Sequence, residues 1–94
     1  IPGVGTTALL PTLVGLGRAS ELALLGERIT AETAMEYGIV TRVVPDTELA
    51  AEARRTAERF VALPTRTIGL TKRAFNRAML PELAAHLEYE AGLQ

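Results

Sequence analysis

The sequence predicts a mainly α-helical fold with one small two-stranded ribbon. From Asp46 onward apolar residues recur with a period of about 3.6, the spacing that gives a helix one apolar face. The first half of the chain alternates apolar runs with helix-capping residues and glycines, which is typical of short helices joined by turns. Residues 40–44 are rich in valine and precede a proline, so we expect a strand there that pairs with residues 28–29.

The N-terminal part of the chain predicts two short helices separated by glycines. Thr6 or Thr7 can cap a first helix that runs through Val14. Pro11 falls inside this segment, and we expect it to be tolerated only in the first turn, where its missing N–H is not needed. A second helix over about residues 18–25 then ends at the next glycine.

The segment that begins at Thr30 carries several agreeing helix signals. Thr30 is a favourable N-cap for a two-turn helix over residues 31–37. Gly38 follows that helix and can adopt the left-handed conformation that closes a helix, while Ile39 can supply the hydrophobic contact that accompanies it.

The second half of the chain predicts three longer helices. The first extends from Asp46 to about Val61 and is ended by Pro64. The next covers residues 65–79, and the last begins at Pro81, a residue that is favoured in the first turn of a helix.

Composition limits the classes of function that are possible. The 94 residues suit one domain at most, and a net charge of −1 favours neither nucleic acid nor an anionic membrane as a partner. The absence of cysteine and the single histidine argue against thiolate and imidazole metal sites, so we expect no metal and no cofactor. No apolar run approaches the roughly 20 residues that span a bilayer, and no signal-peptide pattern is present, so a cytoplasmic location is expected.

Two glycines, Gly3 and Gly5, open the chain just before the first predicted helix. Backbone N–H groups at such a turn can donate to an anion, a polarised oxygen or a water, because the first amides of a helix lack partners within it. The spacing is not the dinucleotide-binding fingerprint, since a third glycine is missing at Ala8. A tight connection without a ligand therefore stays open beside a ligand-binding turn.

Titratable side chains form two sets with helical spacing. Glu32 and Glu36 share one short helix and are expected at its surface. Glu82, His86 and Glu90 are spaced four apart, which allows pairing along an exposed helix face or, as the alternative, a proton relay.

Basic side chains concentrate on the helix predicted over residues 65–79. One interpretation is a solvated face that pairs with the acidic final helix, and the other is a site for a phosphate-bearing ligand. The residues concerned are Arg66, Lys72, Arg73 and Arg77.

Several runs of the chain resemble the C-terminal part of the enoyl-CoA hydratase/isomerase, or crotonase, superfamily. The strongest is "LLGERITAETAMEYGIV", and "LPTLVG" and "LPTRTIGLTKRAFNRA" occur in the same order as in that family. The resemblance implies that residues 1–94 are a single helical segment of the ClpP/crotonase α/β spiral fold. It also implies that the catalytic spiral domain precedes this segment.

The resemblance further implies chemistry on an acyl-CoA thioester, as in fatty acid metabolism. In that family two backbone N–H groups stabilise an enolate-like oxyanion while carboxylates move protons, and both sets lie upstream of the segment seen here. Residues 1–94 are therefore expected to be inactive alone. The Gly3 N–H is expected to position the reacting water or hydroxyl, Pro2 and Gly5 to shape that wall of the substrate site, and Lys72 to contact substrate.

The resemblance leaves the reaction open between two branches. Hydratases more often carry a paired glycine followed by Thr-Gln where this chain has "GVGTTALLP", and "LEYEAGLQ" is more similar to ring-1,2-epoxyphenylacetyl-CoA isomerases. We rank hydration or double-bond isomerisation slightly ahead of the reaction of these ring-epoxide isomerases. Family members assemble as trimers or hexamers, so a homo-oligomer is expected, and an autonomous helical oligomerisation module is the alternative from another functional class.

Overall fold

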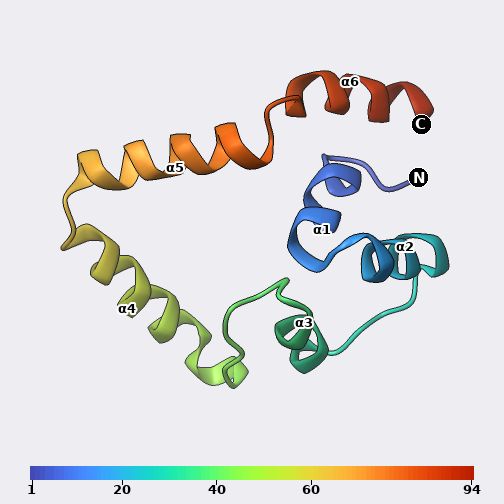
Figure 1. The fold of residues 1–94 in the computed structure, drawn as a ribbon. Helices are drawn as coiled ribbons and strands as arrows, with labels where there is room; N and C mark the ends of the chain where they lie inside the picture. The colour runs from blue at the N-terminus through green and yellow to red at the C-terminus, as the bar shows by residue number, and fades with distance from the viewer. The chain divides into compact units, whose positions relative to one another are not determined.

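The computed structural model describes residues 1–94 and contains only helices, which confirms the mainly α prediction (Figure 1). The chain divides into two compact units, residues 1–43 with 80–94, and residues 44–79. Its elements are α1 (Thr6–Val14), α2 (Leu16–Leu25), α3 (Ala31–Tyr37), the 3-10 helix η1 (Asp46–Glu48), α4 (Leu49–Val61), α5 (Thr65–Met79) and α6 (Leu83–Leu93).

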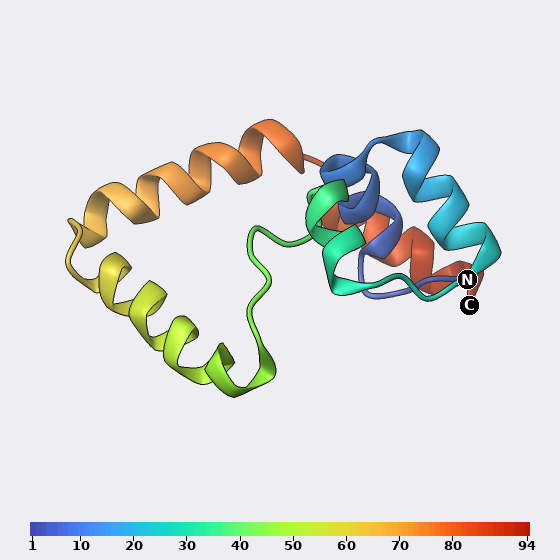
Figure 2. The same cartoon turned by 90° about the horizontal axis from the view of Figure 1, so that it is seen from below.

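The first unit is built around α1, which packs against α2 and contacts α6. Figure 2 shows α6 beside α1, with the N- and C-terminal ends of the chain close together. The side-chain amide of Gln94 donates a hydrogen bond to the Ile1 carbonyl over 3.1 Å. On another side of the unit, the Arg18 guanidinium lies 4.3 Å from the ring centre of Tyr37, a cation–π contact that links α2 to α3.

The second unit consists of η1, α4 and α5. The 3-10 turn leads directly into α4, and its Glu48 N–H donates to the Pro45 carbonyl over 2.8 Å. The two longer helices are separated by residues 62–64 and do not pack along their lengths. Large apolar side chains of this unit, such as Phe60 and Phe75, are exposed.

The helices α3 and α5 were predicted correctly, α3 from its local capping signals. The Thr30 hydroxyl accepts a hydrogen bond from the Thr33 N–H over 3.1 Å, and Gly38 closes α3 with a φ of 85°. Residues 65–79 form α5 as predicted. The predictions were less accurate elsewhere, because α2 begins at Leu16 and α6 begins at Leu83.

The predicted ribbon between residues 28–29 and 40–44 is wrong, since neither segment is a strand. The reason lies at the end of α3, where the N–H groups of Ile39 and Val40 both donate to the Ala34 carbonyl, over 2.9 and 3.4 Å. These donors complete the helix cap instead of a strand ladder. A ribbon of two isolated strands would also be marginally stable.

The predicted start of α1 needs two corrections. Its N-cap is Gly5 in a left-handed conformation, with no side-chain cap from Thr6 or Thr7. Pro11 lies in the middle of the helix and not in its first turn. The helix continues past this proline, and the Thr12 hydroxyl donates to the Ala8 carbonyl over 2.9 Å one turn away.

Few residues of this chain are buried by its own helices. Only Gly5, Ala19 and Glu90 are buried, whereas many large apolar side chains are open to solvent, among them Leu24 at 84% and Val61 at 83% exposure. None of the helices has the length and apolar character needed to cross a membrane. The helices thus present apolar faces that this chain does not cover.

Candidate functional site at the N-terminus of α1

Residues 3–6 form a β-turn whose two central residues have positive φ angles. The Thr6 N–H and the Thr6 hydroxyl both donate to the Gly3 carbonyl, over 3.1 and 2.7 Å. Val4 and Gly5 occupy the two central positions with φ angles of 52° and 85°, as in a type I′ turn. Glycine adopts this conformation freely, but a β-branched residue such as Val4 is strained in it.

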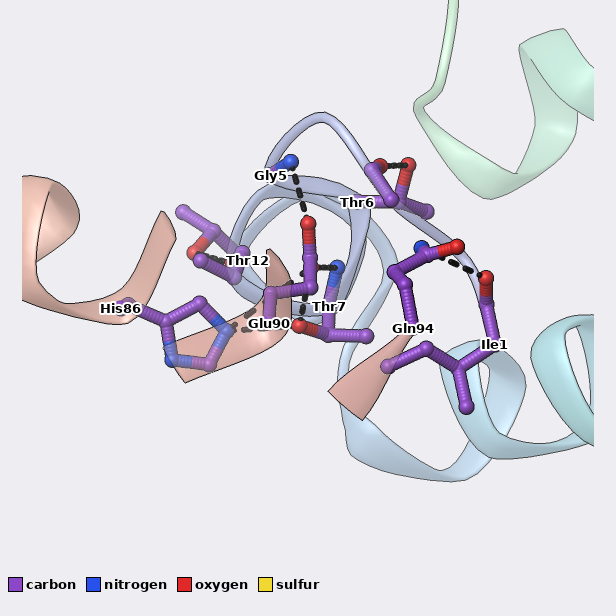
Figure 3. Close-up of polar contacts among 10 residues, drawn as sticks. Ile1, Gly5, Thr6, Thr7, Thr12, His86, Glu90 and Gln94 are labelled. Carbon is purple, nitrogen blue, oxygen red and sulfur yellow. Dashed lines mark hydrogen bonds and ion pairs between the residues drawn. The ribbon is translucent and has the colours of Figure 1, made fainter. Parts of the chain in front are cut away.

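The carboxylate of Glu90, on α6, anchors the end of this turn (Figure 3). Its Oε1 accepts a hydrogen bond from the Gly5 N–H over 2.7 Å, and its Oε2 accepts from the Thr7 N–H over 3.1 Å. The Thr7 hydroxyl also donates to Oε2, over 2.5 Å. A side chain of the last helix therefore caps the first helix of the chain.

The environment of Glu90 favours its charged form. Hydrogen bonds from the Thr7 hydroxyl and the Gly5 N–H hold the pKa of the Glu90 carboxyl below its ordinary value, although burial acts in the opposite direction. The residue is only 2% exposed. A negative charge is also favourable here because the amides at a helix N-terminus carry partial positive charge.

His86 completes this cluster from one turn earlier in α6. Its Nε2 lies 2.6 Å from the Thr7 hydroxyl oxygen and 4.0 Å from Oε2 of Glu90. Because the single proton of that hydroxyl is donated to Glu90, the hydroxyl oxygen can only accept from His86. We infer that the imidazole carries a proton on Nε2.

The role of Glu90 is not evident from the sequence. Its spacing from Glu82 and His86 predicts an exposed helix face or a proton relay, whereas Glu90 is a buried cap. Spacing within α6 does reveal the neighbouring His86, but no local pattern points to Gly5, which is 85 positions away.

The predicted substrate-site residues fall into two groups. Gly3 and Gly5 lie in the turn and Pro2 immediately precedes it, with Pro2 and Gly3 half-buried. The Gly5 N–H is occupied by Glu90, whereas the Gly3 N–H makes no hydrogen bond within the chain. Lys72 is exposed on α5, in the other compact unit.

An apolar groove of about 200 Å³ runs between α1 and α2 and reaches this turn. Leu10, Leu16 and Leu24 contribute its larger apolar side chains, and Thr6 and Thr7 line it where α1 begins. Polar atoms contribute little to the groove surface. It is therefore suited to an apolar group and not to an ion.

The chain shows a family relationship along its whole length, because the sequence profile described as enoyl-CoA hydratase/isomerase matches residues 1–94. The chain belongs to the enoyl-CoA hydratase/isomerase family. It is 42% identical over 94 residues to a 1,2-epoxyphenylacetyl-CoA isomerase of Escherichia coli (strain K12), covering 100% of this chain and 36% of that protein. It is also 34% identical over 90 residues to a short-chain-enoyl-CoA hydratase of Clostridium acetobutylicum, covering 96% of this chain and 34% of that protein.

A solved structure of an enoyl-CoA hydratase/isomerase from Pseudoalteromonas atlantica T6c is similar in fold. Its TM-score is 0.90 at 32% identity, and the match covers 97% of this chain and 37% of that one. This likeness confirms the predicted fold class, the helical part of the crotonase fold. The chain spans about a third of the length of the relatives it matches.

Proposed function

We propose that residues 1–94 are the C-terminal portion of an enzyme that hydrates or isomerises an acyl-CoA thioester. The observation that carries this proposal is the family match over the entire chain. The relatives support the substrate class, since their names specify epoxyphenylacetyl-CoA and short-chain enoyl-CoA. The reaction would proceed through a thioester enolate stabilised by backbone N–H groups.

Within that reaction, the part of this chain would be to position a reacting oxygen. Glu90 occupies the Gly5 and Thr7 amides, and the Thr6 N–H donates to the Gly3 carbonyl. The N–H groups of Gly3 and Val4 remain available, and the Gly3 N–H is the one proposed to bind a water or a substrate hydroxyl. Pro2 and Gly5 would shape the wall around it. Gly3 and Gly5 lie in the turn and Pro2 immediately precedes it, which supports a common role.

The proton-transferring carboxylates are proposed to lie outside residues 1–94. A general acid or base works best when its pKa is near the working pH. The carboxylate nearest the turn, Glu90, has its pKa held low by the hydrogen bonds it accepts, so it is poorly suited to exchange protons at neutral pH. The preceding spiral domain would supply the acids and the oxyanion donors.

The ring-1,2-epoxyphenylacetyl-CoA isomerase branch is the second candidate. The identity of 42% to such an isomerase, compared with 34% to 36% for several hydratases, favours it. The departure at "GVGTTALLP" from the usual hydratase pattern agrees with this choice. In either branch the enzyme is proposed to be a cytoplasmic homo-oligomer that needs no metal or cofactor.

Activity measurements test this proposal. The complete protein containing residues 1–94 is assayed with crotonyl-CoA and with ring-1,2-epoxyphenylacetyl-CoA, beside the isolated 94 residues. We expect turnover of one substrate by the complete protein and none by the isolated chain. Comparable turnover by the isolated chain would show that the proton-transferring acids lie within it.

Hydrogen exchange separates this proposal from the oligomerisation-module alternative. If the turn belongs to a substrate site, CoA thioester should slow amide exchange in residues 1–15 of the complete protein. An oligomer that forms without ligand and shows no such protection would favour the module.

The proposed contact of Lys72 with substrate is tested by charge reversal. Lys72→Glu should raise the Kd for the negatively charged CoA thioester, and the increase should shrink at high salt because ions screen exposed charges. Arg54→Glu on α4 is the matched control, since it makes the same charge change at another exposed position. Equal affinities for the two variants would remove Lys72 from the substrate site.

A further inference from the structure

Glu90 of α6 and Gln94, the residue that follows α6, both bind the N-terminal segment of the chain (Figure 3). The Gln94 amide donates to the Ile1 carbonyl over 3.1 Å. Glu90 accepts hydrogen bonds from Gly5 and Thr7. An added Cβ at Gly3 would lie 2.8 Å from Nε2 of Gln94, the end of a flexible and exposed side chain that can move aside.

We propose that Glu90 is a positioning residue that sets the direction of the Gly3 N–H toward the reacting oxygen. This inference rests on the function proposed above. In this proposed role Glu90 does not touch the substrate. It acts through the turn that carries the Gly3 amide.

The turn needs such an anchor because its geometry is strained. Val4 is held at a φ of 52° although its side chain is 94% exposed and gains little from packing. If the anchor were lost, Val4 could relax toward negative φ. That rotation would swing residues 1–3 away from their present place relative to α1, and the Gly3 N–H would move with them.

A carboxylate fits this position better than the amide of glutamine. Three donors converge on the two oxygens, one on Oε1 and two on Oε2. A glutamine has one oxygen, so its NH2 group would face at least one N–H or O–H donor. Because Glu90 is buried, water cannot easily satisfy the donor that is left unpaired.

His86 supports the same arrangement through Thr7. Its Nε2 lies 2.6 Å from the Thr7 hydroxyl oxygen, and by donating to that oxygen it directs the hydroxyl proton toward Glu90. Thr7 therefore connects the turn to α6 through both its backbone and its side chain.

The test compares Glu90→Gln with Glu88→Gln in the complete protein. Glu88 is exposed on the same helix, so the control makes the same chemical change away from the turn. We expect Glu90→Gln to lower kcat by about 10- to 100-fold, as a small misplacement near the reacting atoms does, with KM changed by less than about two-fold. Amide exchange in residues 1–7 should become faster in Glu90→Gln and stay unchanged in Glu88→Gln.

The outcomes distinguish this inference from the proposed function. Equal kcat for the two variants, with wild-type turnover intact, would overturn the positioning role of Glu90. No turnover by the wild-type protein would count against the proposed function, while the exchange experiment would still report whether Glu90 holds the turn.

A second pair of variants applies if Glu90→Gln does not fold. Thr7→Val removes one of the three donors to Glu90 and keeps the backbone bond, whereas Thr7→Ser keeps the hydroxyl. We expect a fall in kcat of about 10-fold for Thr7→Val and near wild-type kcat for Thr7→Ser. Wild-type kcat in a folded Thr7→Val protein would argue against positioning through this cluster.

Discussion

Oε1 of Glu90 lies 2.7 Å from the backbone nitrogen of Gly5, although 85 positions separate the two residues in the chain. This contact joins the last helix to the turn that precedes the first helix. It places a buried negative charge where unpaired helix amides would otherwise need another acceptor. The N-terminal turn is consequently defined by α6 as much as by its own residues.

The stability contributed by this contact should depend on pH. The pKa of Glu90 is lowered in the folded state, so the contact stabilises the fold at pH values above the unfolded carboxyl pKa. That stabilisation is lost as the pH falls through the lower folded-state pKa. His86 is the one titratable side chain that faces this carboxylate, with its Nε2 4.0 Å from Oε2.

We expect acidification from about pH 7 to about pH 3 to lower the Tm of the complete protein more steeply for wild type than for Glu90→Gln. Glu88→Gln serves as the control and should follow the wild-type curve. Parallel Tm curves for wild type and Glu90→Gln would show that the ionised Glu90 carboxylate does not stabilise the folded state.

Substitution of Gly5 by alanine should destabilise the protein by about 1–2 kcal/mol, the cost of left-handed backbone in a residue with a Cβ. The new Cβ would also lie 3.2 Å from Cδ2 of Leu87, which must shift. Gly17→Ala is the control, because Gly17 has open space around it and lies within α2. Thermal unfolding should show a lower Tm for Gly5→Ala only, and equal Tm values would contradict the strain argument.

Val4→Gly should raise the Tm, because it relieves a strained residue whose side chain is 94% exposed. Relief of about 1–2 kcal/mol outweighs the entropic cost of glycine, about 0.5–1 kcal/mol. The comparison is Val61→Gly at the end of α4, where the side chain is 83% exposed and glycine should lower the Tm. A loss of stability at both positions would mean that Val4 is not strained.

The isolated 94-residue chain should not behave as a stable monomer. Only three of its residues are buried, Gly5, Ala19 and Glu90, and exposed apolar faces of this kind favour association. Light scattering after size-exclusion chromatography should show assemblies, and an apolar dye should bind with increased fluorescence. A monomer that unfolds in one cooperative transition would contradict this expectation.

The sequence alone determined the helices whose start and end signals lie within a few residues of each other. The Thr30 cap and the Gly38 closure define α3, because both make their hydrogen bonds within that short segment. The family resemblance was equally accessible, since it depends on the order of residues and is supported by the match over the chain.

Only the tertiary structure decided the cap of α1 and the absence of a ribbon. Thr6 and Thr7 are both suitable caps by residue type, but the acceptor for the α1 amides comes from Glu90. Valine-rich residues 40–44 favour a strand by propensity, yet the N–H of Val40 is used to close α3. In both places a backbone donor had more than one possible acceptor, and the choice depended on which group the fold brought within about 3 Å.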